Sequence, residues 1–212
     1  MRLLFIVSST NTSKGGNVLA PMIIRDVITE FRKARVDLIF FKKKKFLNLL
    51  FNIDFSKPNI EEFDKSIFIE ISSLIQLLYW LIRNTKNYNL FVLHGIWSPI
   101  YIITSLFLII FKKPFCFHPH GSLDPFDINK KKKFLKNLLG ILFYNRIFKF
   151  SLGIIFTSKL ESERSKTFGA KPPKYVAILS SPIKQVGEKL NNNQLRNLRD
   201  KYQINENEKI LL

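Results

Sequence analysis

Short apolar runs alternate with segments of helical periodicity along this 212-residue chain, and that alternation restricts the fold more than any other feature. Runs this short and continuous are typical of strands buried on both faces of a parallel sheet. Strands that alternate with helices predict a doubly wound α/β sheet whose crossovers are right-handed. We predict strands over residues 2–8, 36–41, 90–93, 115–117, 153–157 and 175–179.

The segments between these runs predict helices. Ser98-Pro99 is a favourable helix start, and Ser158 with Glu161 fits a capping box. The apolar run 100–111 is too short to span a bilayer and is interpreted as a buried helix. We predict helices over residues 17–31, 67–82, 98–111, 129–150 and 158–168. In the basic helix 129–150, an apolar set recurs at helical spacing and is predicted to be core, with an inserted membrane face as the alternative: Phe134, Leu135, Leu138, Leu139, Leu142 and Phe143.

All three histidines lie within 27 residues, at or just past the ends of two predicted strands. His94 opens the segment HGIWSP, and His118 and His120 lie in HPHGSLDP. Open α/β sheets bind ligands just past the carboxyl ends of their strands, so the two segments predict one site built from neighbouring loops. A histidine that only caps its strand through a backbone hydrogen bond is the alternative. Among the other residues of these segments, Trp97 and Asp124 could contribute to the same site.

The formal net charge is +18, from 34 Lys and Arg against 16 Asp and Glu. Such an excess favours an anionic partner, although an AT-rich coding sequence also raises the lysine content. Tetralysine runs at 42–45 and 130–133 fit either a solvated face or an anionic membrane surface. We find no module that interleaves basic residues with stacking aromatics, so nucleic acid is not an expected partner.

The single cysteine, Cys116, excludes an internal disulfide framework and agrees with a reducing compartment. Its position within a predicted strand predicts a buried thiol. No signal peptide is evident, because the apolar stretch at residues 3–7 is too short. We therefore expect a cytoplasmic protein and leave peripheral attachment to the inner face of the cell membrane open.

The order of these motifs resembles the amino-terminal half of family 4 glycosyltransferases, which have the GT-B architecture of two facing Rossmann-like domains. The resemblance is carried by the Gly15-Gly16 pair after the first strand, then HGIWSP, PHGSLDP and Thr157-Ser158 with Glu161, and finally SSPIK. It covers nearly the whole chain apart from residues 42–65. It implies a Rossmann-like acceptor-side domain at 1–184, a linker at 185–206, and at 207–212 the first strand of a donor-binding domain that this chain lacks.

The resemblance also implies roles for individual residues. His120 matches the family histidine that contacts the donor sugar or its diphosphate, and Gly121 would allow close approach of the backbone. Gly15 and Gly16 match the loop that faces the transferring phosphate. His94 and Trp97 would line the acceptor side, and His118 is a further candidate for substrate binding. Where the family has an Asn-containing turn, this chain has Ser180-Ser181-Pro182.

The expected function is transfer of a sugar from a nucleotide-sugar donor to a glycan or lipid-linked acceptor, of the cell-surface polysaccharide or lipopolysaccharide type. No cofactor and no metal are expected, and a chain lacking the donor domain is expected to be inactive alone. Two alternatives stay open. One is a non-catalytic basic domain that binds a membrane surface, and the other is a metal-dependent hydrolase that uses His118 and His120.

Overall fold

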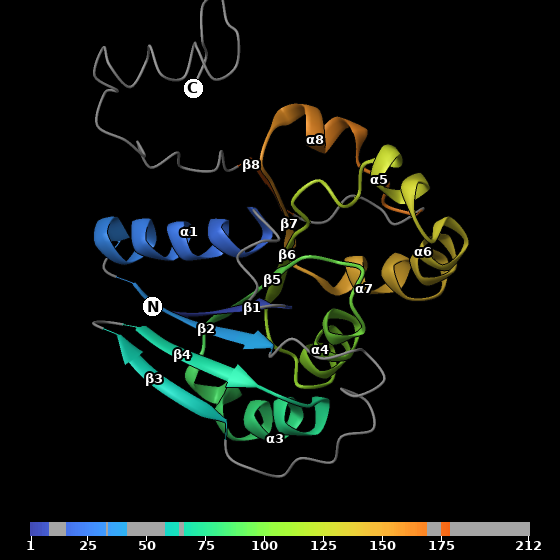
Figure 1. Ribbon diagram of the computed structural model, residues 1–212. Coiled ribbons are helices and arrows are strands. Elements are labelled where there is room, and N and C mark those ends of the chain that lie inside the picture. Colours follow the sequence, from blue (N-terminus) through green and yellow to red (C-terminus); the bar gives the residue numbers. More distant parts are fainter. Residues whose placement is uncertain (9–15, 33, 42–57, 64–65, 169–174, 179–212) are drawn as a thin grey trace, which may run out of the picture. The chain divides into compact units, whose positions relative to one another are not determined.

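In the computed structural model, residues 1–8, 16–32, 34–41, 58–63, 66–168 and 175–178 are described (Figure 1). All of them belong to one compact unit, Met1–Pro182. The predicted linker at 185–206 and the strand predicted at 207–212 lie outside the described residues. The lysine run 42–45 also lies outside them.

Eight strands of the described residues form one sheet in the order β3-β4-β2-β1-β5-β6-β7-β8. Every pairing is parallel except β3 with β4, which is antiparallel and lies at one edge. The doubly wound α/β fold predicted from the sequence is thereby confirmed. The strands are β1 (Arg2–Val7), β2 (Arg35–Phe41), β3 (Asn59–Phe63), β4 (Ser66–Ile71), β5 (Leu90–His94), β6 (Phe115–His118), β7 (Gly153–Phe156) and β8 (Tyr175–Ile178).

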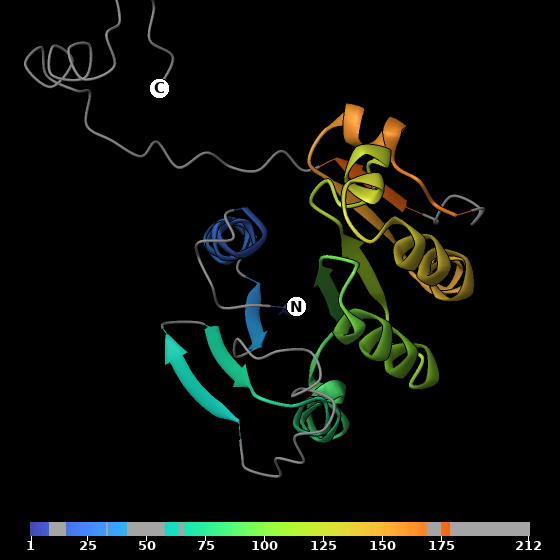
Figure 2. The same cartoon turned by 45° about the vertical axis from the view of Figure 1, so that its right-hand side comes forward.

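Helices cover both faces of the sheet. Figure 2 shows α1 on one side of the strands and α3, α4 and α7 on the other. The helical elements are α1 (Gly16–Arg32), α3 (Leu74–Asn84), η2 (Thr85–Asn87), α4 (Pro99–Ile110), α5 (Pro125–Lys130), α6 (Lys133–Leu139), the π-helical turn η3 (Gly140–Tyr144), α7 (Asn145–Phe150) and α8 (Lys159–Arg164). Among the described residues, no helix combines the length and apolarity that crossing a membrane requires.

The alternation of side chains along each strand produces two cores. In β1, Leu4 and Ile6 face the larger core, which packs against α3, α4 and α7. Leu3 and Phe5 of the same strand face the smaller core, together with Ile24 of α1. Both faces of the central strands are therefore apolar, which explains why their sequences lack the polar alternation of a half-exposed strand.

The prediction of a single helix over 67–82 is wrong. Residues 66–71 form strand β4, and α3 begins only after Ser73, whose side chain accepts a hydrogen bond from the amide of Gln76. The apolar residues Ile67, Ile69 and Ile71 have the period of two that a strand requires, and their β-branched side chains favour it. Strand β3 was not predicted at all.

The prediction of one helix over 129–150 is also wrong. Asp124 caps a short helix, α5, and a break at residues 131–132, with Lys132 at a φ of 54°, separates it from α6. The apolar set in this region is not core as predicted, because only Leu139 and Phe143 pack against the larger core. The other members are exposed: Phe134, Leu135, Leu138 and Leu142.

Cys116 is buried and unpaired, as predicted. Its side chain lies in the smaller core on β6. Burial raises the pKa of this thiol to about 12, because an apolar environment disfavours the thiolate. The cysteine is therefore an inert part of the packing.

Candidate functional site

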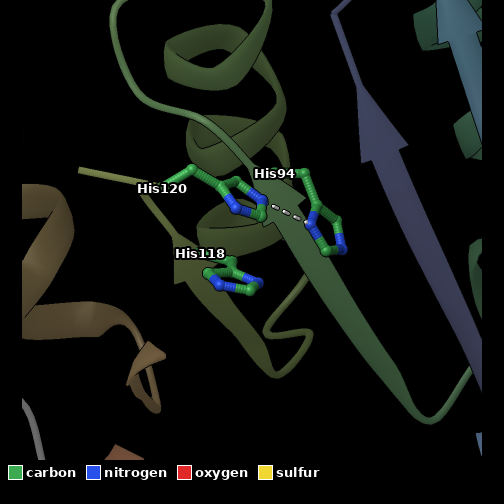
Figure 3. Close-up of side chains that lie close together, drawn as sticks. All are labelled: His94, His118 and His120. Carbon is green, nitrogen blue, oxygen red and sulfur yellow. Dashed lines mark hydrogen bonds between the residues drawn. The ribbon is translucent and has the colours of Figure 1, made fainter. Parts of the chain in front are cut away.

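The three histidines meet at the carboxyl edge of the sheet. His94 ends β5 and His118 ends β6, and the two residues are direct partners in the parallel register. His120 follows two residues later and folds back over both (Figure 3). The prediction that the two His-containing loops adjoin is therefore matched by the geometry.

The imidazoles contact one another directly. Nδ1 of His94 lies 3.1 Å from Nε2 of His120, so one nitrogen donates a hydrogen bond and the other accepts it. The rings of His118 and His120 stack with centroids 3.8 Å apart, at an interplanar angle of 23°. On the other side, the ring of Phe5 lies 4.6 Å from that of His94. The cluster is thus packed against an apolar wall.

Two polar atoms of the cluster have no partner among the described residues. Nε2 of His94 and Nε2 of His118 are buried and make no hydrogen bond there. An unpaired buried polar atom costs about 1–3 kcal/mol, and such atoms call for a functional or structural explanation. Both histidines also line an apolar pocket of about 450 Å³ beside α1, together with Phe5 and Val92.

Burial keeps all three imidazoles neutral at pH 7. Burial, with a smaller contribution from the neighbouring His120, lowers the pKa of His118 to about 3. Burial lowers the pKa of His120 to about 4, against the opposing charge of Glu161. The pKa of His94 is well below its usual value for the same reason, with His118 and His120 adding to the effect. A neutral imidazole has one N–H donor and one acceptor nitrogen, which suits hydrogen bonding to a ligand.

Glu161 holds the loop that carries His120. One carboxylate oxygen accepts a hydrogen bond from the Gly121 amide at 2.6 Å. The other accepts from the amide and the hydroxyl of Thr157, at 2.7 and 2.6 Å. Ser158 caps α8 as predicted, since its hydroxyl accepts from the Glu161 amide at 3.1 Å. The carboxylate accepts from Thr157 and Gly121, so Glu161 also connects β7 to the histidine loop, a contact that the capping box does not predict.

The backbone at the turn is left-handed. His120 has a φ of 51° and Gly121 a φ of 79°. A Cβ at Gly121 would meet no described residue within 4 Å, so the left-handed backbone conformation, and not crowding by those residues, is what favours glycine here. The Gly121 amide is used by Glu161 and is not free to bind an anion.

Tyr101 fixes the end of β5. Its hydroxyl donates to the carbonyl of His94 and accepts from the amide of Ser8 at 3.0 Å. Burial raises the pKa of this phenol to about 12, so it stays protonated as a donor. A Cβ on Gly95, whose φ is 132°, would lie 2.7 Å from the Tyr101 ring. The glycine of HGIWSP therefore leaves room for the tyrosine that positions His94.

Trp97 lies apart from the imidazoles. Its indole N–H donates to the carbonyl of Ser122 at 2.7 Å, which joins the two His-containing loops. Its ring packs edge-on against Tyr144 and Phe168. These contacts make Trp97 a brace between the two loops, and its place on the acceptor side, which the family resemblance implies, stays a prediction.

The remaining predicted residues divide into two groups. Gly16 is the first residue of α1, which follows β1 and thus begins near the carboxyl edge, whereas Gly15 lies outside the described residues. Asp124 is occupied as a helix cap and pairs with Arg164 at 3.1 Å. It is therefore not one of the groups around the histidines.

In the described part of the chain, His94, His118 and His120 form a cluster that could bind a metal ion. Their candidate ligand atoms lie within 4.8 Å of one another. A metal ion lies close to the plane of each imidazole that binds it. The stacked rings of His118 and His120 cannot both meet this condition without rotating. The nearest nitrogens of His94 and His120 are 3.1 Å apart, near the separation of two ligands on one tetrahedral ion, but these rings are also nearly parallel, at 25°, and would have to rotate too.

Comparison with known proteins bears on the fold. No family model and no curated protein matches the chain. The crystal structure of Anabaena Alr3699/HepE in complex with UDP-glucose is similar, with 16% identity, a TM-score of 0.56, and coverage of 96% of this chain and 50% of that chain. The same protein in complex with UDP gives 15% identity with the same TM-score and coverage. The chain thus spans about half the length of Alr3699/HepE, and its fold agrees with a Rossmann-like half of a GT-B architecture.

Proposed function

We propose that this chain forms one half of a glycosyltransferase that moves a sugar from a nucleotide-sugar donor to a glycan or lipid-linked acceptor. The observation that carries the proposal is the position of His120. Its neutral imidazole sits on a left-handed turn at the carboxyl edge of the sheet, hydrogen-bonded to His94 and held by Glu161. The fold in which it sits is similar to half of a protein crystallised with UDP-glucose.

The chemistry of sugar transfer suits these residues. As the bond between the sugar and the diphosphate breaks, negative charge grows on the leaving phosphate, and a preorganised donor stabilises it. When His94 Nδ1–H donates to Nε2 of His120, the proton of His120 lies on Nδ1 and can be donated to that phosphate. Burial lowers the pKa of His120, and the charge of Glu161 opposes this effect, so Glu161 helps the imidazole to hold a proton once the anion is bound.

The other predicted residues take supporting roles in the proposal. The amides at the start of α1, which begins at Gly16, offer hydrogen bonds to an anionic group. Nε2 of His94 and of His118 would bind hydroxyl groups of the acceptor, and these hydrogen bonds would offset the cost of burying two atoms that have no partner among the described residues. Trp97 would act on the acceptor side only through the loop that it braces. We retain the family 4 assignment and an acceptor in polysaccharide or lipopolysaccharide synthesis as parts of the proposal, together with a cytoplasmic location.

A transfer assay on the protein that carries this chain tests the proposal. Donors would be a panel of uridine, guanosine and adenosine diphosphate sugars, acceptors would be extracted membrane glycolipids, and nucleoside diphosphate release would be measured. His120→Ala should lower turnover by about 10²-fold or more. The matched control is Asn87→Ala, an exposed residue at the amino edge of the sheet, which should leave turnover unchanged. Full turnover by folded His120→Ala would contradict the proposed role.

A metal-dependent hydrolase is the second candidate, favoured by the proximity of the three histidines. His94, His118 and His120 would supply one ligand each after rotation of their rings. Metal analysis of the purified protein distinguishes the candidates. A stoichiometric ion whose removal abolishes activity would favour the hydrolase, whereas transfer that survives a chelator would favour the glycosyltransferase.

A further inference from the structure

An exposed apolar face runs along α6 and the following turn. Its residues are Phe134, Leu135, Leu138, Ile141 and Leu142, which we call the α6 face. Their spacing of one, three and four places them on one side of the helix. They are 81%, 46%, 41%, 63% and 53% exposed, respectively. Single exposed apolar residues are ordinary, but a contiguous group of this kind marks an interaction surface.

The opposite side of the same helical segment is the one that packs against the sheet. Leu139 and Phe143 lie against the larger core, and Tyr144 is fully buried there. The helix is therefore apolar on both sides, and its orientation is fixed by the inner side. In both Figure 1 and Figure 2, α5 and α6 lie at one margin of the described unit.

A strong positive charge accompanies the α6 face. From residue 128 to residue 160 the sequence contains no Asp or Glu. The same stretch contains eight basic residues: Lys130, Lys131, Lys132, Lys133, Lys136, Arg146, Lys149 and Lys159. Lys130–Lys133 are all exposed and extend from the last residue of α5 to the first residue of α6.

The nearest acids do not cancel this charge. Asp127 is paired with Lys136 at 3.0 Å, and Asp124 with Arg164 at 3.1 Å. Glu161 is buried and engaged with Gly121. The four lysines of 130–133 therefore stand beside the apolar face without an acidic partner among the described residues.

We propose that the α6 face and Lys130–Lys133 together dock this chain on an anionic lipid bilayer. Apolar side chains would enter the boundary between headgroups and acyl chains, while the lysines bind the negative headgroups. A second copy of the chain is a poorer occupant, because a symmetric contact would bring two strongly positive surfaces together. Nucleic acid is poorer still, since four of the five side chains are aliphatic and cannot stack on bases. The inference does not depend on sugar transfer.

Flotation of the full 212-residue chain with vesicles tests the proposal. Vesicles of phosphatidylcholine alone would be compared with vesicles that also contain phosphatidylglycerol, at low and at high salt. Binding should require the anionic lipid and should weaken as salt screens the lysines. Equal binding to both kinds of vesicle would overturn the charge argument.

Two pairs of variants separate charge from insertion. Lys131→Gln/Lys133→Gln should weaken binding by about fivefold for each lysine removed, whereas Lys86→Gln/Lys112→Gln, at exposed lysines elsewhere, should change it less. Phe134→Ser/Leu138→Ser should weaken binding by about tenfold or more. Its control is Ile60→Ser/Ile82→Ser, which replaces apolar residues that are 51% and 61% exposed on β3 and α3. Unchanged binding by Phe134→Ser/Leu138→Ser would overturn the proposal.

A single fluorescent label reports directly whether the α6 face enters the bilayer. Because Cys116 is buried, a fluorophore attached to Leu142→Cys is site-specific, and Ile82→Cys provides the control. Brominated lipid should quench the probe at position 142 and leave the probe at 82 unaffected. Sedimentation equilibrium tests whether a second copy of this chain covers the α6 face instead. A wild-type dimer that Phe134→Ser/Leu138→Ser converts to a monomer, or equal quenching at both positions, would overturn membrane docking.

Discussion

Nδ1 of His94 lies 3.1 Å from Nε2 of His120, although 26 residues separate the two in the sequence. The distance is set by two features that are independent of each other. The parallel register of β5 with β6 brings His94 beside His118, and the left-handed turn at His120 and Gly121 folds the second loop back. A change to the loop should therefore alter the histidine cluster while the sheet stays intact.

Glu161→Ala should loosen the loop that carries His120. The substitution removes the acceptor for the Gly121 amide and for both donor groups of Thr157. Because Glu161 is buried, we expect a loss of about 3 kcal/mol in the free energy of unfolding, measured by urea denaturation. The control is Glu163→Ala, whose exposed pair with Lys159 at 3.8 Å should contribute less than about 0.5 kcal/mol. Equal effects of the two substitutions would contradict this role for Glu161.

Asp37→Ala should destabilise the fold without altering the histidine site. Asp37 is fully buried and accepts hydrogen bonds from Arg2, Tyr88 and the amide of Ile67, at 2.8 Å each. Its removal leaves these donors unpaired, which should cost about 3–5 kcal/mol in the free energy of unfolding.

The control for Asp37 is the exposed Asp26, whose replacement by Ala should change stability little. The histidine Hε1 chemical shifts of folded Asp37→Ala should match those of the wild type, because Asp37 lies opposite Leu4, away from the carboxyl edge. Shifted histidine resonances would show that the two ends of the sheet are coupled.

The histidines should make stability depend on pH on the acid side. The pKa of His118 is lowered to about 3 in the folded chain, whereas an unfolded histidine titrates near 6.5. Between these values the unfolded state binds more protons, so stability falls as the pH falls from about 6.5 towards 3. Each such histidine contributes a slope of up to about 1.4 kcal/mol per pH unit.

His118→Gln should reduce the dependence of the free energy of unfolding on pH by up to about 1.4 kcal/mol per pH unit, the contribution of one histidine. Urea denaturation at a series of pH values from about 7 down towards 3 measures this slope. The change in slope reports the lost protonation, whereas the packing cost shifts the whole curve by a constant amount. A parallel shift with unchanged slope would show that His118 is not held neutral by the fold.

Gly95→Ala and Gly121→Ala should differ in their cost. Both glycines have a positive φ, but a Cβ at Gly95 collides with Tyr101 at 2.7 Å, whereas a Cβ at Gly121 meets no residue of the described part within 4 Å. Gly121→Ala should therefore cost only the backbone strain, about 1–2 kcal/mol in the free energy of unfolding, and Gly95→Ala should cost more. Thermal unfolding of both variants measures the difference. Restoration of Gly95→Ala by Tyr101→Phe would contradict the collision, because phenylalanine keeps the ring.

Residues 1–212 by themselves should not transfer sugar. The chain spans half the length of Alr3699/HepE, and we propose that the other half of the site comes from a second domain. Transition-state stabilisation that depends on both halves is lost when one is absent. Release of UDP from UDP-glucose in the presence of acceptor measures this, and robust transfer by residues 1–212 would contradict a divided site.

Some of this architecture follows from the sequence alone. The runs at β1, β5 and β6 are continuous and apolar, and only a strand buried on both faces needs that pattern, so the parallel sheet was predictable. The positions of His94 and His118 at strand ends follow from where the apolar runs stop. The cap at Ser158 was predictable because a side-chain cap depends only on residues next to one another along the chain.

Tertiary structure decided the rest, because the deciding contacts join residues distant in the sequence. Ile67–Ile71 satisfy both a strand and a helix pattern locally, and pairing with β2 selects the strand. The carboxylate of Glu161 reaches Gly121 across 40 residues, which no local pattern encodes. The segment from Phe134 to Phe143 is apolar on two sides, and periodicity cannot tell which side the sheet will cover. Burial of Leu139 and Phe143 by the larger core left Phe134 and its neighbours in solvent, since one helix can press only one side against a sheet.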